Sequence, residues 1–122
     1  LNVWAKEATK VQRLHMLRYE DMRAEPHASL KALLAFMDVS ATQAQIDGAV
    51  EYSSYDNMKQ MESKAQFKLS GGRMMPGDKD NPDSYKVRRA KVGGYRDYFS
   101  DAEVAAIDAR LAETLDPMFG YP

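Results

Sequence analysis

The chain contains no cysteine, so neither a disulfide framework nor thiolate chemistry can contribute to it. A sequence without cysteine suits the reducing cytoplasm, which is the compartment we expect. The chain also lacks any apolar run close to the roughly 18 residues that a membrane-spanning helix needs, and its opening residues, Leu1 to Trp4, do not resemble a signal peptide. We therefore expect no membrane association.

An excess of charge is missing as well. The 122 residues include 17 basic and 18 acidic ones, which gives a net charge of -1, so no overall field draws the chain to nucleic acid or to an anionic membrane. Any anion-binding site must be local. The apolar share of 44% favours a folded domain, and because the chain opens on Leu1, without an initiator Met, we expect a piece of a longer protein.

Familiar catalytic and metal-binding motifs are absent from the sequence. There is no G-x-x-x-x-G-K-[ST] phosphate loop, no H-E-x-x-H and no G-x-S-x-G. His15 and His27 stand twelve positions apart, without ligand spacing, so we interpret both as structural or surface residues and predict no metal site. Glu20 and Asp21 could form a functional pair, but a capping or ion-pair role is the interpretation we favour.

The hydrophobic pattern predicts a mostly helical segment with one or two short strands. Residues 3–13 are compatible with a helix, and the apolar run 14–19 reads as a strand. An amphipathic helix begins near Pro26, with apolar positions at Leu30, Leu33, Leu34 and Met37. Ser40 followed by Gln43 predicts a capping box for a helix that reaches about Tyr52. Ser100 and Glu103 repeat this spacing before a last helix, whose apolar stripe runs from Val104 to Leu115.

Residues 64–96 are different, because glycine and proline interrupt them and no periodicity is present. This predicts a long loop. Its first part, 64–85, has two open interpretations, part of a lid over an acceptor substrate or a disordered surface insert.

The most concentrated chemical signal is the basic segment, residues 86–96, with five basic residues, no acidic residue and a pair of glycines. Guanidinium groups bind phosphate in a bidentate fashion, and glycine lets backbone N–H groups approach its oxygens. A phosphate site and a solvated basic loop that balances acid elsewhere are both open. RNA binding is less favoured, because aromatic residues are not interleaved with the basic ones.

A second candidate region is residues 52–59, at the junction of two helices. Ser53 or Ser54 could cap the second helix, which is the reading we favour from the residues alone. The functional alternative supplies a hydroxyl for a ring nitrogen, the aromatic face of Tyr55 for a purine, and Met58 as an apolar wall.

Three segments together resemble the cytosolic-type sulfotransferases in order and spacing: Leu17-Arg18-Tyr19-Glu20-Asp21-Met22, Ser53-Ser54-Tyr55-x-x-Met58, and Arg88 to Phe99. The resemblance covers nearly the whole chain, from about Val11 to Leu115. It implies an α/β fold related to the P-loop nucleotide kinases, of which this chain would be the C-terminal part. It also implies transfer of a sulfuryl group from 3′-phosphoadenosine 5′-phosphosulfate to the hydroxyl or amine of a small-molecule acceptor.

The family's binding residues carry over position by position. Arg88 and Arg89 match the Arg-Lys pair that holds the 3′-phosphate, and Ala90 stands where the family has a glycine. Near the adenine, Ser53 and Tyr55 match the hydroxyl and aromatic positions, Met58 the apolar neighbour, and Tyr19 the tyrosine that reaches the base. An alanine at position 90 is tolerable if its φ is negative and damaging if the loop needs a positive φ.

The resemblance also sets limits. The family's phosphosulfate loop and catalytic base would precede Leu1, so we expect the N-terminal half of the same enzyme as partner and no transfer by this chain alone. Two arginine contacts and one stacked base contribute roughly 4 to 9 kcal/mol of favourable interaction free energy. Association and loop ordering offset several kcal/mol of this, which predicts a millimolar Kd for adenosine 3′,5′-bisphosphate. Asp101 and Ala105 depart from the family's dimerisation motif, so no dimer is transferred. The rival interpretation is a non-catalytic helical module whose basic loop binds a partner protein or polyanion.

Overall fold

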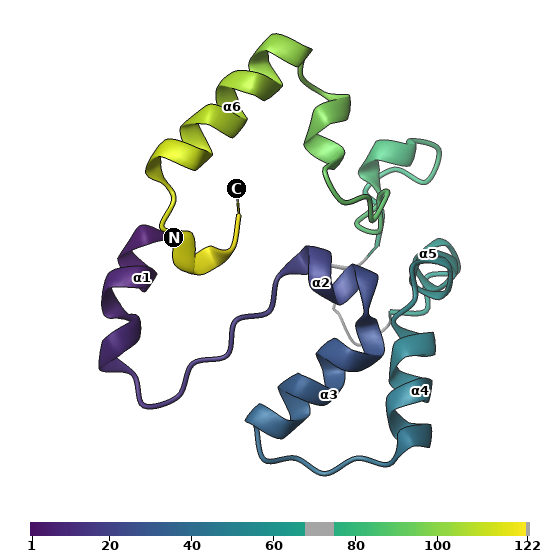
Figure 1. Ribbon diagram of the computed structural model, residues 1–122. Coiled ribbons are helices and arrows are strands. Elements are labelled where there is room, and N and C mark those ends of the chain that lie inside the picture. Colours follow the sequence, from purple (N-terminus) through teal and green to yellow (C-terminus); the bar gives the residue numbers. More distant parts are fainter. Residues whose placement is uncertain (68–74, 122) are drawn as a thin grey trace. The chain divides into compact units, whose positions relative to one another are not determined.

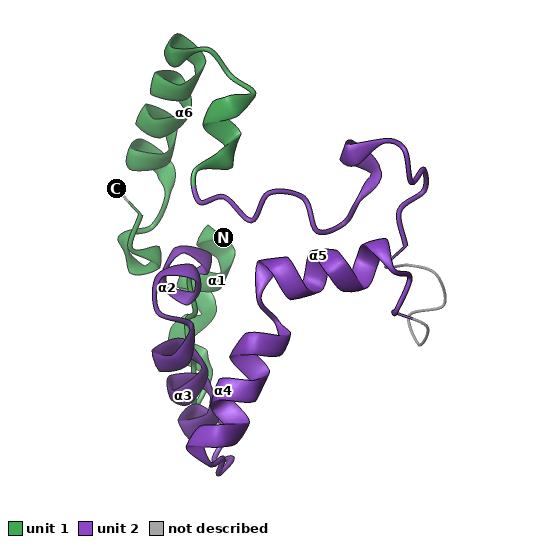
Figure 2. Ribbon diagram, turned by 90° about the vertical axis from the view of Figure 1, so that its right-hand side faces the viewer, with its two compact units in different colours: residues 1–18, 93–122 green, residues 19–92 purple. Residues whose placement is uncertain are grey.

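The chain divides into two units in the computed structural model, which describes residues 1–67 and 75–121. One unit joins residues 1–18 to the C-terminal residues from 93 onward, and the other is residues 19–92 (Figure 2). We refer to them as unit 1 and unit 2. The predicted loop 64–85 is described only in part, because residues 68–74 lie outside the described residues.

Unit 2 begins with four helices that pack in sequence order (Figure 1): α2 (Tyr19–Ala24), α3 (Pro26–Phe36), α4 (Gln43–Tyr52) and α5 (Tyr55–Ser63). Proline at the first position of α3 has no N–H to leave unpaired there, so the predicted start at Pro26 is confirmed. Ile46 of α4, at 5% exposure, is the buried centre of this packing. Glu20 and Asp21 lie in the first turn of α2, where carboxylates interact favourably with the helix dipole.

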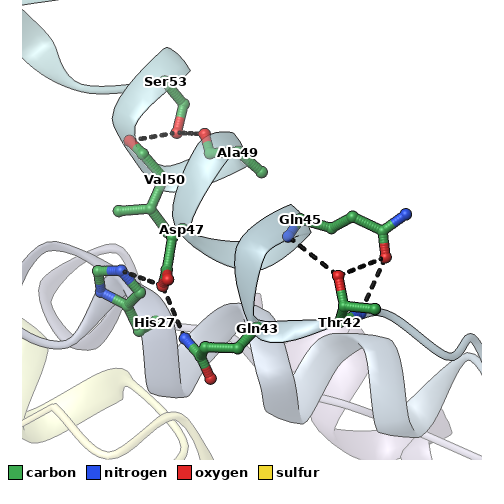
Figure 3. Close-up of polar contacts among 8 residues, drawn as sticks. All are labelled: His27, Thr42, Gln43, Gln45, Asp47, Ala49, Val50 and Ser53. Atoms are coloured by element: carbon green, nitrogen blue, oxygen red, sulfur yellow. Dashed lines mark hydrogen bonds and ion pairs between the residues drawn. The ribbon is translucent and has the colours of Figure 1, made fainter.

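The end of α3 explains why the predicted cap of α4 was wrong. Asp38 adopts a left-handed conformation, and the Val39 N–H donates to the Leu34 carbonyl at 2.9 Å, which closes α3. Residues 39–42 are outside any helix, so the capping box forms at Thr42 and Gln45 rather than at Ser40 and Gln43. The Thr42 N–H donates to Gln45 Oε1 at 2.8 Å, and the Gln45 N–H donates to Thr42 Oγ1 at 3.3 Å (Figure 3).

The strand predicted over residues 14–19 is not confirmed. Residues 11–18 carry no helix, Val11 is extended with φ -97° and ψ 141°, and Tyr19 already begins α2. No strand is present in residues 1–67 and 75–121. A strand needs a neighbour for its backbone hydrogen bonds, and the described chain offers none. The mostly helical character of the segment is confirmed.

Unit 1 contains α1 (Asn2–Glu7) with a 3₁₀ turn Ala8–Lys10, the 3₁₀ turn Gly94–Asp97, α6 (Asp101–Thr114) and the 3₁₀ turn Pro117–Phe119. The predicted capping box at Ser100 and Glu103 is confirmed, with the Ser100 N–H donating to Glu103 Oε2 at 2.8 Å. The backbone and side-chain hydrogen bonds that Glu103 accepts from Ser100 lower the pKa of this carboxyl group.

Hydrogen bonds join the two ends of the described chain within unit 1. Asn2 Nδ2 donates to the Thr114 carbonyl at 2.5 Å, the Asp116 N–H donates to Asn2 Oδ1 at 3.0 Å, and Arg18 Nη1 donates to the Gly120 carbonyl at 2.6 Å. No residue pattern in the sequence indicated these contacts.

Residues 75–93 are irregular apart from the 3₁₀ turn Pro82–Ser84. The predicted loop is therefore confirmed over its described part. In the parts of the chain that the structure describes, no helix has the length and apolar character required to cross a lipid bilayer.

Candidate functional site

The aromatic and basic segments that the sequence analysis singled out meet in unit 2. Tyr55, the first residue of α5, donates its hydroxyl proton to the backbone carbonyl of Arg88 at 2.8 Å, across 33 positions of sequence. Lys59, one turn further along α5, donates to the same tyrosine oxygen at 2.9 Å. This hydrogen bond to Tyr55 is the main cause of a raised Lys59 pKa. Helix α5 and the basic loop, residues 86–91, thus form one local structure.

The arginine side chains of the basic loop are exposed. Arg88 Nη2 lies 3.2 Å from Asp83 Oδ1, and the two side chains are 48% and 77% exposed. Arg89 is exposed as well. An ion pair this accessible to water contributes little, so a phosphate group can compete with Asp83 for the guanidinium group of Arg88.

Ala90 adopts the conformation that the sequence analysis identified as unfavourable. Its φ is +49°, in the left-handed region where the Cβ of an L-residue crowds the following carbonyl oxygen, at a cost of about 1 to 2 kcal/mol. Gly93, three residues later, also has a positive φ of 68°. Two residues of the basic segment, residues 86–96, therefore adopt the left-handed conformation that favours glycine, and one of them is alanine.

The two serines at the α4–α5 junction have different roles. Ser54 caps α5, accepting a hydrogen bond from the Asn57 N–H at 3.4 Å. Ser53 donates its hydroxyl proton to the carbonyl of Ala49 at 2.8 Å, with the carbonyl of Val50 at 3.3 Å (Figure 3). The capping interpretation is confirmed for Ser54. In this arrangement the Ser53 hydroxyl hydrogen is used within α4, and the Ser53 oxygen remains able to accept a hydrogen bond from a ligand. The predicted contact of Ser53 with a ring nitrogen stays a prediction.

The other candidate residues lie around this junction to different degrees. Met58 is half-buried one turn after Tyr55. Tyr19 begins α2, a helix that packs mainly against α3, and 43% of its surface is exposed. The structure thus brings Tyr55 and the Arg88 backbone into direct contact, with Ser53 and Met58 nearby in sequence, whereas Tyr19 lies on a different helix, α2.

A hollow of about 580 Å³ lies beside the same junction but is a separate feature. Its described lining includes Glu51, Asp56, Asn57 and Gln60, and neither arginine of the basic loop is part of it. Two carboxylates in the lining repel an anion. We therefore do not assign the phosphate site to this hollow.

One site residue was missed by the sequence analysis. Glu62, near the end of α5, is 0% exposed and accepts hydrogen bonds from the backbone N–H groups of Lys86 and Val87 at 2.6 and 2.8 Å. The signal was available as helical spacing, because Tyr55, Lys59 and Glu62 stand at i, i+4 and i+7 and so share one face of α5.

Arg96, the last basic residue of the predicted segment, belongs to unit 1 and has a structural role there. Its Nη2 contacts Asp108 Oδ2 at 2.8 Å, and Tyr95 donates its hydroxyl proton to Asp108 Oδ1, also at 2.8 Å. The hydrogen bond from Tyr95, followed by that from Arg96, lowers the pKa of Asp108, and the same bond raises the pKa of Tyr95.

Comparison with known proteins adds independent information. The family model described as "Sulfotransferase domain" matches residues 1–119. The chain is 27% identical to cytosolic sulfotransferase 17 of Arabidopsis thaliana, over 93% of this chain and 33% of that protein. It is 23% identical to flavonol 4′-sulfotransferase of Flaveria chlorifolia, over 94% of this chain and 36% of that protein. The chain thus spans about a third of the length of the curated relatives it matches. No solved structure matches it.

Proposed function

Because the chain belongs to the sulfotransferase domain family, we propose that it binds the adenosine 3′-phosphate part of 3′-phosphoadenosine 5′-phosphosulfate, the sulfuryl donor that the family uses. The hydrogen bond between the Tyr55 hydroxyl and the Arg88 carbonyl carries this proposal. It holds an aromatic side chain beside the backbone of a loop that presents two exposed arginines, which is the arrangement that a purine with a ribose phosphate requires.

The phosphate is assigned to Arg88 and Arg89, with the backbone at Ala90 closing on it. A phosphate oxygen accepts charge-assisted hydrogen bonds from guanidinium groups, each worth about 1.5 to 3 kcal/mol. The exposed carboxylate of Asp83, 3.2 Å from Arg88, occupies one guanidinium group in the absence of ligand. Binding would replace this carboxylate contact by contacts with a dianion, and the exchange would favour the nucleotide.

The adenine is assigned to Tyr55, Met58, Ser53 and Tyr19. The hydroxyl group of Tyr55 is occupied by Arg88 and Lys59, so its ring face, rather than its oxygen, is what a purine would stack on. The Ser53 hydroxyl donates its hydrogen bond to the Ala49 carbonyl in α4. Its oxygen could therefore accept a hydrogen bond from the amino group of adenine. Tyr19 would reach the base if α2 places this side chain on the face of the base opposite to Tyr55.

The complete enzyme would transfer the sulfuryl group to a hydroxyl or amine acceptor, in the cytoplasm, with the remainder of the domain supplied by polypeptide that precedes these residues. An apolar hollow of about 180 Å³ in unit 1 supports this assignment. Its lining includes Trp4, Val11, Leu14, Met118 and the buried Phe119, and Trp4 is 69% exposed. Such exposed apolar surface is typical of a face that packs against further protein. Residues 1–122 are then the C-terminal portion of one domain, inactive alone.

The proposal is tested by titrating the chain with adenosine 3′,5′-bisphosphate and following amide resonances, a method suited to millimolar affinities. Arg88→Ala and Arg89→Ala should each raise the Kd by about tenfold or more, the effect of losing one charge-assisted contact. Arg110→Ala is the matched control, because that arginine is 73% exposed on α6 and its loss should leave the Kd unchanged.

Adenosine 5′-monophosphate separates the 3′-phosphate from the rest of the ligand. It should bind more weakly than the bisphosphate, and the two arginine variants should bind it as the unchanged chain does. If short RNA or polyphosphate binds as well as the bisphosphate, the helical module with a generic polyanion loop is the better description. Equal binding of the bisphosphate by all variants would remove the phosphate site.

A further inference from the structure

Glu62 is unusual because it is a charged side chain without any contact with water. It is 0% exposed, and among the described residues it is the one polar or charged residue classed as buried. A buried carboxylate is costly unless hydrogen bonds compensate its lost hydration. Here the compensation comes from the backbone, because the carboxylate oxygens accept one hydrogen bond each, from the N–H of Lys86 at 2.6 Å and from the N–H of Val87 at 2.8 Å.

These two N–H groups immediately precede the arginines of the basic loop. In the next residue, the carbonyl of Arg88 accepts the hydrogen bond from Tyr55 at the opposite end of α5. Three consecutive residues of the loop are therefore fixed to one face of one helix. Fixing the backbone on that face leaves the side chains of Arg88 and Arg89 exposed.

We propose that Glu62 is a positioning residue for the phosphate site, whose carboxylate holds the loop backbone so that Arg88 and Arg89 present their guanidinium groups together. This inference rests on the proposed function. It explains why a carboxylate is used. Two adjacent N–H donors need two acceptor oxygens, whereas a glutamine offers one oxygen and an NH₂ group that faces an N–H. The loop has no helix of its own, so its order depends on contacts such as this anchor and the hydrogen bond from Tyr55.

The anchor itself can be tested without nucleotide, by amide hydrogen exchange of the chain. The N–H groups of Lys86 and Val87 should exchange at least about tenfold more slowly than that of Val92, a residue of the same segment that is 46% exposed. Glu62→Gln should abolish the difference for at least one of the two N–H groups, because glutamine keeps only one acceptor oxygen. Glu113→Gln is the matched control, because Glu113 is 73% exposed on α6, and it should not change the exchange rates.

The role in binding is tested by discrimination between two ligands. Glu62→Gln should weaken binding of adenosine 3′,5′-bisphosphate by about tenfold and leave binding of adenosine 5′-monophosphate unchanged, because the monophosphate lacks the group that the arginines hold. A purely structural role, in which the variant only loosens α5, would weaken both ligands equally. Glu113→Gln should bind both as the unchanged chain does.

The outcomes separate the two claims. Loss of slow exchange with intact discrimination in Glu62→Gln would overturn the positioning role and leave the proposed function standing. Failure of the unchanged chain to prefer the bisphosphate would reject the proposed function. The exchange comparison in the unchanged chain needs no variant, so equal rates at Val87 and Val92 overturn the anchor even if Glu62→Gln does not fold.

Discussion

Replacing Ala90 by glycine tests whether the phosphate-binding turn stores backbone strain. Alanine at φ +49° costs about 1 to 2 kcal/mol relative to a right-handed conformation. Glycine removes this cost, but it also gives the unfolded chain more conformational freedom, worth about 0.5 to 1 kcal/mol. The difference leaves a net gain, so the free energy of unfolding should rise by about 0.5 to 1 kcal/mol.

Chemical denaturation of matched variants measures this gain. Ala65, which follows the end of α5, has φ +54°, so Ala65→Gly should stabilise the chain by a similar amount. Ala32 lies within α3, where a change to glycine should destabilise by about 1 kcal/mol. The reasoning is refuted if Ala90→Gly behaves like Ala32→Gly.

The same substitution should also affect ligand binding. Ala90 stands where the resemblance to the sulfotransferases places a glycine, and removal of its methyl group lets the backbone N–H come closer to phosphate oxygens. Ala90→Gly should therefore lower the Kd for adenosine 3′,5′-bisphosphate, whereas Ala65→Gly should not. A gain in stability with weaker binding would show that the methyl group contacts the ligand.

Two further predictions concern elements away from the site. Thr42→Ala should lower the free energy of unfolding by about 1 kcal/mol through loss of the capping box. Ser40→Ala should change it by only a few tenths of a kcal/mol, and urea denaturation measures both. A larger effect of Ser40→Ala than of Thr42→Ala would indicate that Ser40 is the cap. Asp108 has a folded-state pKa below its ordinary value of 3.8, caused first by Tyr95 and then by Arg96. The stability that ionised Asp108 contributes is thus complete above pH 3.8 and is lost as the pH falls through the folded pKa. The melting temperatures of the unchanged chain and of Asp108→Asn should therefore differ at neutral pH and converge in acid. A difference that does not change with pH would contradict this.

The helices could be predicted where their signals are local. Pro26 fixes the start of α3, and the apolar spacing after it marks the face that carries the half-buried Leu30, Leu33 and Leu34. The box of Ser100 and Glu103 fixes the start of α6. The cap of α4 was predicted at Ser40 but forms at Thr42, which stands three residues before Gln45 as Ser40 does before Gln43; the choice depends on how the turn at Asp38 ends α3.

The predictions that failed or were missed depend on distant partners. The apolar run 14–19 has the composition of a strand, but a strand forms only against another strand. Helical spacing places Glu62 on the same face of α5 as Tyr55 and Lys59. Its partners are backbone N–H groups 24 and 25 positions away, and the residue pattern does not indicate them. The meeting of Tyr55 with Arg88 is likewise a long-range contact, which the resemblance suggested and which residue spacing alone could not.

The basic segment shows why composition is a weak guide to ligand binding. Arg88 and Arg96 are the same residue type in one cluster of positive charge. Arg96 shares Asp108 with Tyr95 and is held at 2.8 Å, so removing it leaves the carboxylate of Asp108 with one partner fewer. Arg88 has a longer contact of 3.2 Å to a carboxylate that is 77% exposed, and its backbone, not its side chain, is fixed by α5. A fixed backbone with an exposed guanidinium group suits an anion site, and this distinction separates Arg88 from Arg96.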